Sequence, residues 1–177
     1  MDSEVILILG GARSGKGLFA QQLATELGGR VLFVATALPL DEEMRRRIEL
    51  HKKARPKTWR TVEAPTGVAK ALQVEDADVI ILDCLTLLVS NLLGNARNPG
   101  DIDAVQSDIL DELSQLLELK KRIIIVSNEV GMGLVPDNPL GRVYRDLLGR
   151  ANQFVAQRAD RVYLMIAGIP LQLKGRD

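Results

Sequence analysis

The chain has 177 residues, 46% of them hydrophobic and 26% charged, which is enough for an α/β domain with a full core. Lys plus Arg and Asp plus Glu number 23 each, so the formal net charge is zero, and aromatic residues make up only 3%. The charge balance argues against general binding to nucleic acid or to an anionic membrane. The scarcity of aromatic residues argues against a platform for stacking bases.

The cysteine content and the start of the chain bear on its location. Cys84 is the single cysteine, so the chain forms no internal disulfide, which is typical of a cytoplasmic protein. The start is acidic and the apolar run behind it covers only residues 5–9, so we expect neither a signal peptide nor membrane insertion. Because we find no linker and no second core pattern, residues 1–177 are expected to form a single domain.

The first motif is a phosphate-binding loop between a strand and a helix. The apolar residues 5–9 predict a buried parallel strand, and residues 18–27 predict a helix. The segment between them fits the P-loop pattern G-x-x-x-x-G-K. Its glycines let backbone N–H groups point at one anion, and its lysine reaches the β- and γ-phosphates. The candidate phosphate-binding residues are Gly10, Gly11, Ala12, Arg13, Ser14, Gly15, Lys16 and Gly17.

Gly17 departs from the P-loop pattern, which ends in Ser or Thr. That residue normally supplies the hydroxyl that binds Mg²⁺, so we expect an intact phosphate cradle with one metal ligand missing. The alternative interpretation of the whole segment is an ordinary glycine turn between a strand and a helix.

A second strand is expected at residues 30–35, with an exit loop at 36–40. Ligands collect at the carboxyl ends of strands in open α/β sheets, so Ala35, Thr36 and Ala37 are candidate nucleotide-binding residues. The alternative interpretation is an ordinary connection between a strand and a helix.

Residues 41–54 are expected to form a helix with Asp41 as its N-cap. Met44, Ile48 and His51 recur at positions i, i+4 and i+7, so they share one face. The positions around that face are strongly basic: Arg45, Arg46, Arg47, Lys52, Lys53 and Arg55.

His51 is the single histidine, and two interpretations of it stay open. A lone histidine on an apolar helical stripe is commonly a half-buried packing residue. Alternatively, the neighbouring cations disfavour protonation of the ring and would neutralise a phosphate. A histidine that attacks a nucleotide α-phosphate needs both conditions. The basic positions could equally form a solvated helix face.

Two further strands carry candidate carboxylates. Residues 57–63 alternate as a short strand with Glu63 on the same face as Trp59, where Glu63 could accept hydrogen bonds from a base or ribose or lie in solvent. Residues 79–83 are four apolar residues followed by Asp83. This is a Walker-B-like pattern, in which the carboxylate holds Mg²⁺ directly or through water.

The remaining elements complete an alternating pattern. Helices are expected at residues 68–73, 86–93, 101–119 and 139–159, and strands at 122–127, 161–167 and 168–174. Alternation of apolar strands with helices predicts an α/β fold with a mostly parallel sheet flanked by helices.

Taken together, these residues resemble the bifunctional adenosylcobinamide kinase / adenosylcobinamide-phosphate guanylyltransferase family of cobalamin biosynthesis. Beside the P-loop, the matching positions are Arg47-Ile48, His51, Arg55-Pro56, Trp59, Thr61, Glu63, Asp83 to Thr86, Asn91-Leu92, Asn128 to Gly131, Gly133, Val135-Pro136, Arg145-Asp146, Gly149, Asn152-Gln153 and Ala159-Asp160. They span almost the whole chain, and the blocks around His51 and Asn128 are more specific than the P-loop.

The resemblance implies a P-loop NTPase of the RecA-like type with two reactions at one site. A nucleoside triphosphate phosphorylates adenosylcobinamide. GTP then transfers GMP to His51 with loss of pyrophosphate, and adenosylcobinamide phosphate takes up the GMP. The implied nucleotide site adds Ala35, Thr36, Ala37, Lys52, Lys53, Ala54, Arg55, Glu63 and Asp83 to the P-loop residues. The implied cofactor is Mg²⁺, with GTP and/or ATP as substrates, and the implied assembly is a homo-oligomer, with a trimer expected.

Gly17 stands where the family has serine, so we expect weaker direct Mg²⁺ coordination in this chain, with more effect on the kinase step than on the guanylyl step. Two alternatives remain open from the sequence. One is a P-loop kinase of another small molecule with a structural His51. The other is a nucleotide-binding regulatory module with weak catalysis.

Overall fold

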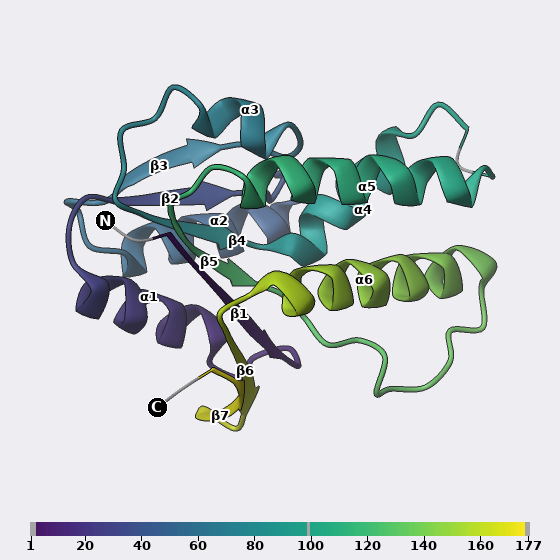
Figure 1. Ribbon diagram of the computed structural model, residues 1–177. Helices are drawn as coiled ribbons and strands as arrows, with labels where there is room; N and C mark the ends of the chain where they lie inside the picture. Colours follow the sequence, from purple (N-terminus) through teal and green to yellow (C-terminus); the bar gives the residue numbers. More distant parts are fainter. Residues whose placement is uncertain (1–2, 99, 176–177) are drawn as a thin grey trace.

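The computed structural model describes residues 3–98 and 100–175, and its centre is a sheet in the order β3-β2-β4-β5-β1-β6-β7 (Figure 1). All neighbouring strands in it are parallel except the antiparallel pair β6 and β7. The strands are β1 (Glu4–Gly10), β2 (Val31–Ala35), β3 (Arg60–Glu63), β4 (Val79–Asp83), β5 (Arg122–Val126), β6 (Arg161–Ile166) and β7 (Ile169–Lys174). The helices are α1 (Lys16–Leu27), α2 (Glu42–Ala54), α3 (Val68–Leu72), α4 (Leu85–Asn95), α5 (Ile102–Leu117) and α6 (Pro139–Arg158). The expected mostly parallel α/β sheet is confirmed.

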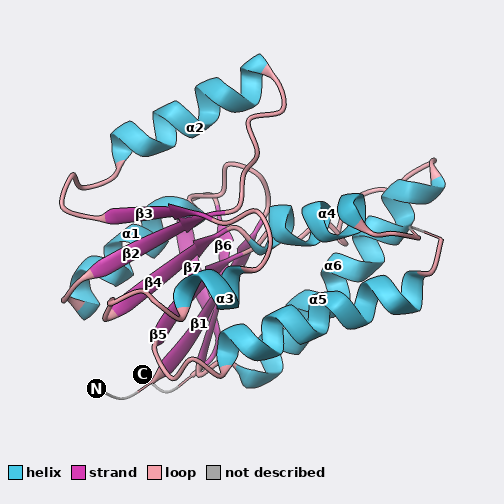
Figure 2. Cartoon of the chain, turned by 90° about the horizontal axis from the view of Figure 1, so that it is seen from above, coloured by secondary structure: helices cyan, strands magenta, loops and turns pink. Residues whose placement is uncertain are grey.

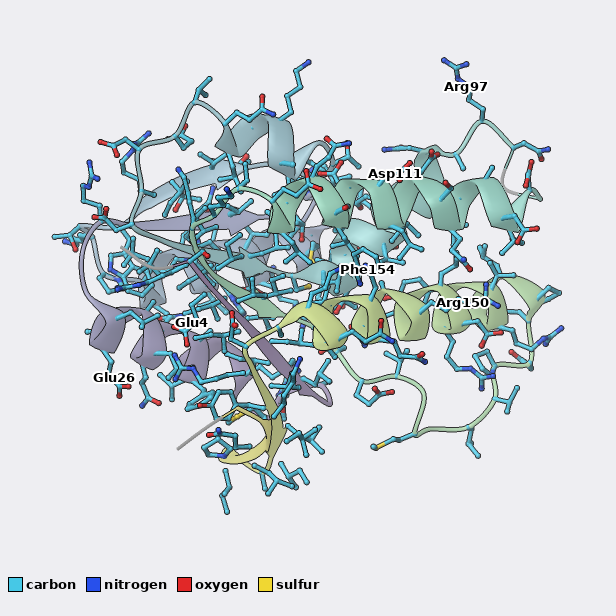
Figure 3. The ribbon with its side chains drawn as sticks, viewed as in Figure 1. Glu4, Glu26, Arg97, Asp111, Arg150 and Phe154 are labelled. Atoms are coloured by element: carbon cyan, nitrogen blue, oxygen red, sulfur yellow. The ribbon has the colours of Figure 1, made fainter. Side chains whose placement is uncertain are left out.

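Helices cover both faces of the sheet, and this explains the unbroken apolar runs of the central strands. In β1, Val5 and Leu7 belong to the core under α3, α4, α5 and α6, whereas Ile6 and Ile8 belong to the core under α1. Successive side chains of a strand point to opposite faces, so a strand buried on both sides is apolar throughout. Charged side chains lie on the outside, as Glu26 of α1 and Asp111 of α5 illustrate (Figure 3).

The helix α2 differs from the others, because none of its residues is buried. In Figure 2 it lies apart from the sheet, beyond β3. The expected half-buried stripe is only partly formed: Met44 and Ile48 are half-buried, but His51 is exposed. The structure therefore does not support the interpretation of His51 as a half-buried packing residue.

Element boundaries differ from the predictions mainly at β3, which begins at Arg60 rather than at residue 57. A turn precedes it, closed by the Trp59 N–H that donates to the Pro56 carbonyl at 3.1 Å. Residues 1–2 of the acidic start and residues 176–177 of the expected domain lie outside the described residues. None of the helices in the described part of the chain is long and apolar enough to span a membrane.

Candidate nucleotide site at the carboxyl edge of the sheet

The parallel register brings the candidate residues of three strands into one row. Glu63 of β3 pairs with Ala35 of β2, and Ala35 pairs with Asp83 of β4. The row continues through β5 to Ile8 of β1, two residues before the P-loop. These residues therefore meet at the carboxyl edge of the sheet, where ligands bind in folds of this type.

The P-loop has a backbone that only glycine can adopt at two positions. Gly10 has φ +152°, and a Cβ there would lie 2.6 Å from the carbonyl oxygen of Met165. Gly15 has φ +94° and lies against Gly168, whose N–H donates to the Ser14 carbonyl at 3.0 Å. The loop is thus packed on the turn between β6 and β7, and its curled shape is held by close backbone contacts.

Lys16 lies within this loop, with only 8% of the residue exposed. Its Nζ donates to the carbonyls of Gly10 at 2.9 Å and Gly11 at 2.5 Å, and lies 3.4 Å from the Ser14 hydroxyl. Burial lowers the pKa of Lys16, and the neighbouring Cys84 and Asp83 oppose that shift. The ammonium therefore lies close to Asp83, and a bound triphosphate would replace neutral carbonyl partners with charged oxygens.

The C-terminal part of α2 reaches the same edge. The Nδ1 atom of His51 lies 3.7 Å from Oδ2 of Asp83. The His51 side chain is 56% exposed, whereas that of Asp83 is 21% exposed. The single histidine of the chain therefore lies beside the Walker-B-like carboxylate, with most of its ring open to a ligand.

Two of the cations that follow His51, Lys52 and Arg55, have partners of their own. Lys52 donates to Glu63 through an Nζ–Oε1 contact of 2.9 Å. Arg55 stacks on Phe33, with its Cζ 3.4 Å from the ring centroid, and donates to the Thr61 hydroxyl at 3.3 Å. Burial lowers the pKa of Arg55, while Asp83 and Glu63 act in the opposite direction. Phe33 was not among the predicted site residues, since a buried strand residue carries no sequence signal for stacking on a guanidinium.

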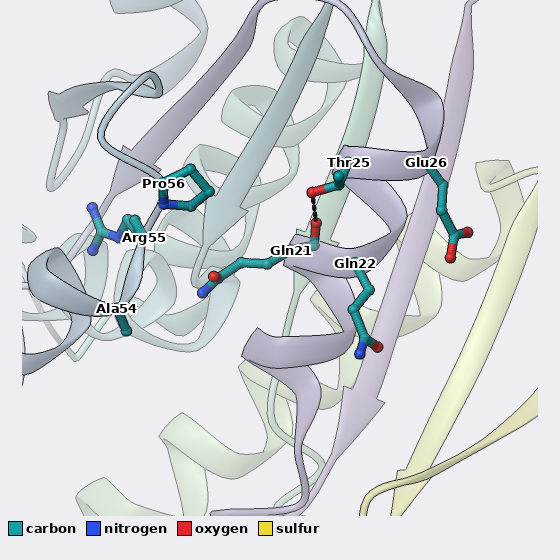
Figure 4. A pocket seen from close by; sticks show the side chains of 7 residues that line it. All are labelled: Gln21, Gln22, Thr25, Glu26, Ala54, Arg55 and Pro56. Carbon is teal, nitrogen blue, oxygen red and sulfur yellow. Dashed lines mark hydrogen bonds between the residues drawn. The ribbon is translucent and has the colours of Figure 1, made fainter.

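Two cavities share Arg55 and Pro56 among their lining residues. One, of about 540 Å³, lies between α1 and the connection from α2 to β3, and Figure 4 shows Gln21 of α1 extending toward Ala54 and Arg55. The other, of about 620 Å³, is more basic. Its lining residues are Lys52, Lys53, Arg55, Pro56, Lys57, Trp59, Thr61 and Glu63. The predicted residues Lys52, Lys53, Arg55 and Glu63 thus share one hollow.

Thr36 lies beneath the site rather than in it, because it is 0% exposed. Its hydroxyl donates to the Cys84 carbonyl and accepts from the Cys84 N–H, both at 2.8 Å. The amide of Asn91 in α4 donates to the carbonyls of Thr36 at 2.8 Å and Pro65 at 3.0 Å. These bonds fix the exits of β2 and β4 relative to each other, so Thr36 positions Asp83.

The exits of β4 and β5 are joined by a second network. Thr86 accepts from the Asn128 N–H at 2.8 Å, and the Ser127 hydroxyl donates to Asn152 at 2.7 Å. Asn152 in turn donates to the Asn128 carbonyl at 3.2 Å. An asparagine inside the apolar face of a helix is the signal that could have identified this network from sequence, because buried amides need partners.

Replacement of Thr36 by valine is expected to lower the free energy of unfolding by about 1–3 kcal/mol, because it leaves the Cys84 N–H without a partner. It also removes one of the two hydrogen bonds that the Cys84 carbonyl accepts, the other being from the Leu88 N–H. Urea unfolding of the variant measures this loss. Thr25→Val is the matched control, since the Thr25 hydroxyl bonds to Gln21 on the exposed side of α1. If Thr36→Val and the control had equal free energies of unfolding, the hydrogen bonds of Thr36 would not be what fixes the exits of β2 and β4 relative to each other.

The site fits Mg²⁺ as an ion carried by a nucleotide. Within residues 3–98 and 100–175, no three His, Cys, Asp or Glu side chains are grouped so that they could hold a metal ion alone. Asp83 offers one carboxylate and Gly17 offers no hydroxyl. Mg²⁺ in nucleotide sites takes one or two protein carboxylates, with phosphates and water supplying the rest, so Asp83 meets this need.

Burial and the neighbouring Asp83 raise the pKa of the Cys84 thiol to about 11, so this cysteine stays uncharged.

Comparison with solved structures supports the fold. The flagellar accessory protein FlaH of Methanocaldococcus jannaschii aligns with a TM-score of 0.55 at 18% identity, over 99% of this chain and 80% of that chain. A Pyrococcus horikoshii protein aligns with a TM-score of 0.61 at 11% identity, over 99% and 88% of the two chains. At these identities the likeness concerns the fold alone, which is α/β and RecA-like.

Comparison of the sequence gives much closer relatives. Residues 6–173 match the family described as cobinamide kinase / cobinamide phosphate guanyltransferase. The bifunctional adenosylcobalamin biosynthesis protein CobP of Pseudomonas aeruginosa is 45% identical over 96% of both chains. The corresponding protein CobU of Salmonella typhimurium is 41% identical over 96% of this chain and 99% of its own. The chain therefore belongs to the cobinamide kinase / cobinamide phosphate guanyltransferase family.

Proposed function

We propose that this chain catalyses both reactions for which its family is named, and that His51 carries GMP in the second. It phosphorylates adenosylcobinamide with a nucleoside triphosphate and then converts the phosphate to adenosylcobinamide-GDP with GTP. Family membership over residues 6–173 supports the two activities. The proposed role of His51 rests on one observation. Its Nδ1 lies 3.7 Å from Oδ2 of Asp83, at the carboxyl edge of the sheet where the P-loop also lies.

The roles of the site residues follow from their places. The P-loop from Gly10 to Gly17 holds the triphosphate, with Lys16 on the β- and γ-phosphates. Thr36 lies beneath the site and positions Asp83, and its neighbours Ala35 and Ala37 line the exit of β2. Lys52, Lys53, Ala54 and Arg55 follow His51 in α2 and its C-cap, so they lie where the α-phosphate would meet the ring. Glu63, at the end of the same row, is assigned to the base or ribose, for which it would exchange its bond to Lys52.

Guanylyl transfer then needs two displacements. Nδ1 of His51 faces Asp83, which leaves Nε2 to attack the α-phosphorus. A P–N bond forms, the bond from the α-phosphorus to the bridging oxygen breaks, and pyrophosphate leaves. A phosphate oxygen of adenosylcobinamide phosphate next attacks the same phosphorus, the P–N bond breaks, and the neutral ring is restored. Each displacement requires in-line geometry and charge neutralisation, and the cations that follow His51 supply the latter.

Asp83 would hold Mg²⁺ directly or through water. When bound, the ion neutralises charge on the triphosphate. The chain's own residues orient the nucleotide around it: the P-loop backbone holds the phosphates, and Asp83 keeps His51 at the same edge.

The assay for this function follows adenosylcobinamide in the presence of the protein, Mg²⁺, and ATP or GTP. We expect adenosylcobinamide phosphate as the first product and, with GTP, adenosylcobinamide-GDP together with pyrophosphate. The two donors tested separately identify which of them feeds the kinase step. Tight GTP binding without either product would contradict the function and favour a binding module.

We further propose that residues 1–177 act as one domain in a cytoplasmic homo-oligomer, with a trimer as the expected state. Exposed apolar side chains on the edge strand β7 support this: Ile169 is 69% exposed, Leu171 51% and Leu173 55%. Large apolar patches on a surface commonly mark interaction sites. Sedimentation of the purified protein measures the oligomeric state, and a monomer at all concentrations would contradict it.

A further inference from the structure

We infer that Gly17 leaves one coordination position of the nucleotide-bound Mg²⁺ to water, and that this chain consequently favours guanylyl transfer over phosphoryl transfer. The inference rests on the proposed function, because it compares the two steps assigned to this site. It concerns a position at which this chain departs from the P-loop pattern, which calls for Ser or Thr there.

The glycine is not required by the shape of the loop. Gly17 is the second residue of α1, and its φ lies outside the left-handed range that favours glycine. A Cβ built at this position would meet no heavy atom within 4 Å. A serine would therefore fit, and what the glycine changes is the chemistry of the position rather than its packing.

Other hydroxyl groups at this edge are already engaged. The Thr36 hydroxyl both donates to and accepts from the backbone of Cys84. Thr86 accepts from the Asn128 N–H, and Ser127 is 0% exposed and donates to Asn152. The Ser14 hydroxyl lies 3.4 Å from the Lys16 ammonium. Water is the ligand that remains for the ion at this position, and Mg²⁺ retains water readily.

The missing hydroxyl at position 17 is expected to slow phosphoryl transfer more than guanylyl transfer. In the phosphoryl step, a bond forms from the adenosylcobinamide hydroxyl oxygen to the γ-phosphorus and the bond to the β,γ-bridging oxygen breaks. The hydroxyl proton goes to solvent. Charge changes at the β- and γ-phosphates, which are held by the P-loop and the ion. In the guanylyl step it changes at the α-phosphate and on the α,β-bridging oxygen that leaves with pyrophosphate, and there Lys52, Lys53 and Arg55, which follow His51, would share with the ion the task of neutralising charge.

The test uses the full-length protein with Mn²⁺ in place of Mg²⁺ and an α,β-methylene analogue of GTP, which cannot donate GMP. Electron paramagnetic resonance in ¹⁷O-labelled water counts the waters on Mn²⁺. We expect one water fewer in Gly17→Ser than in the natural protein, and about tenfold tighter Mn²⁺ binding. We also expect the ratio of kinase to guanylyltransferase kcat/KM to rise about tenfold. Gly94→Ser is the matched control, because a Cβ at Gly94 in α4 also meets nothing within 4 Å.

Equal water counts and equal Mn²⁺ affinity in Gly17→Ser and the natural protein would overturn the inference, since another group would then fill the position. An equal rise in both activities would overturn the claimed preference. The metal readout is repeated with His51→Ala as background, where the same loss of one water is expected. This separates the inference from the proposed function, because a failure of His51 to carry GMP would leave the water count unchanged.

Discussion

His51→Ala is expected to lower guanylyl transfer at least about 10³-fold, while phosphorylation of adenosylcobinamide falls less than about tenfold. The physical reason is that only the second reaction needs a nucleophilic ring nitrogen to hold GMP. Separate steady-state assays of the two steps, each with its own purified substrate, measure the difference.

The control for this variant is Leu50→Ala, at the preceding position of α2. Leu50 is 65% exposed, so its removal changes neither the core nor the contact with Asp83. Both activities should stay near those of the natural protein. If His51→Ala retained guanylyl transfer within tenfold of this control, direct attack of the acceptor on GTP would replace the covalent route.

Lys16→Met is expected to lower both reactions about 10²- to 10³-fold and to weaken GTP binding. Methionine nearly matches the length of lysine but carries no charge. The buried Lys16 ammonium, which donates to two carbonyls of the loop, is the cation that we propose contacts the phosphates. Calorimetric titration with GTP and kinetic assays of each step give the two readouts.

Thermal unfolding separates this effect from loss of the fold. Since burial already disfavours the charged form of Lys16, an uncharged side chain should leave the melting temperature close to that of the natural protein. Lys70→Met is the matched control, because Lys70 is exposed on α3. A Lys16→Met protein with natural stability and undiminished turnover would refute the assigned role of the P-loop lysine.

Much of this site could be predicted from the sequence because the residues stand at ends of recognisable strands. Apolar runs predicted β1, β2 and β4, and parallel strands place their carboxyl ends at one edge. From that rule alone, Ala35 is expected to lie beside Asp83, and the two residues are paired in the register of β2 and β4. The P-loop follows from its glycine and lysine spacing.

The remaining features depend on tertiary contacts that no local pattern carries. Periodicity in α2 predicted a packed face, but the sequence does not show that this helix lies away from the sheet with no buried residue. Thr36 was predicted to contact nucleotide, whereas its hydroxyl is held by Cys84, 48 positions further along the chain. Contacts over such separations require the folded chain.

The most direct test of the central claim is incubation of the protein with Mg²⁺ and GTP labelled at the α-phosphate, beside the His51→Ala variant. The proposed mechanism predicts label bound to the natural protein and absent from the variant. The bond should be labile to acid and stable to alkali, as a phosphoramidate is. Absence of label from the natural protein, with GTP binding confirmed separately, would contradict the assignment of His51 as the residue that carries GMP.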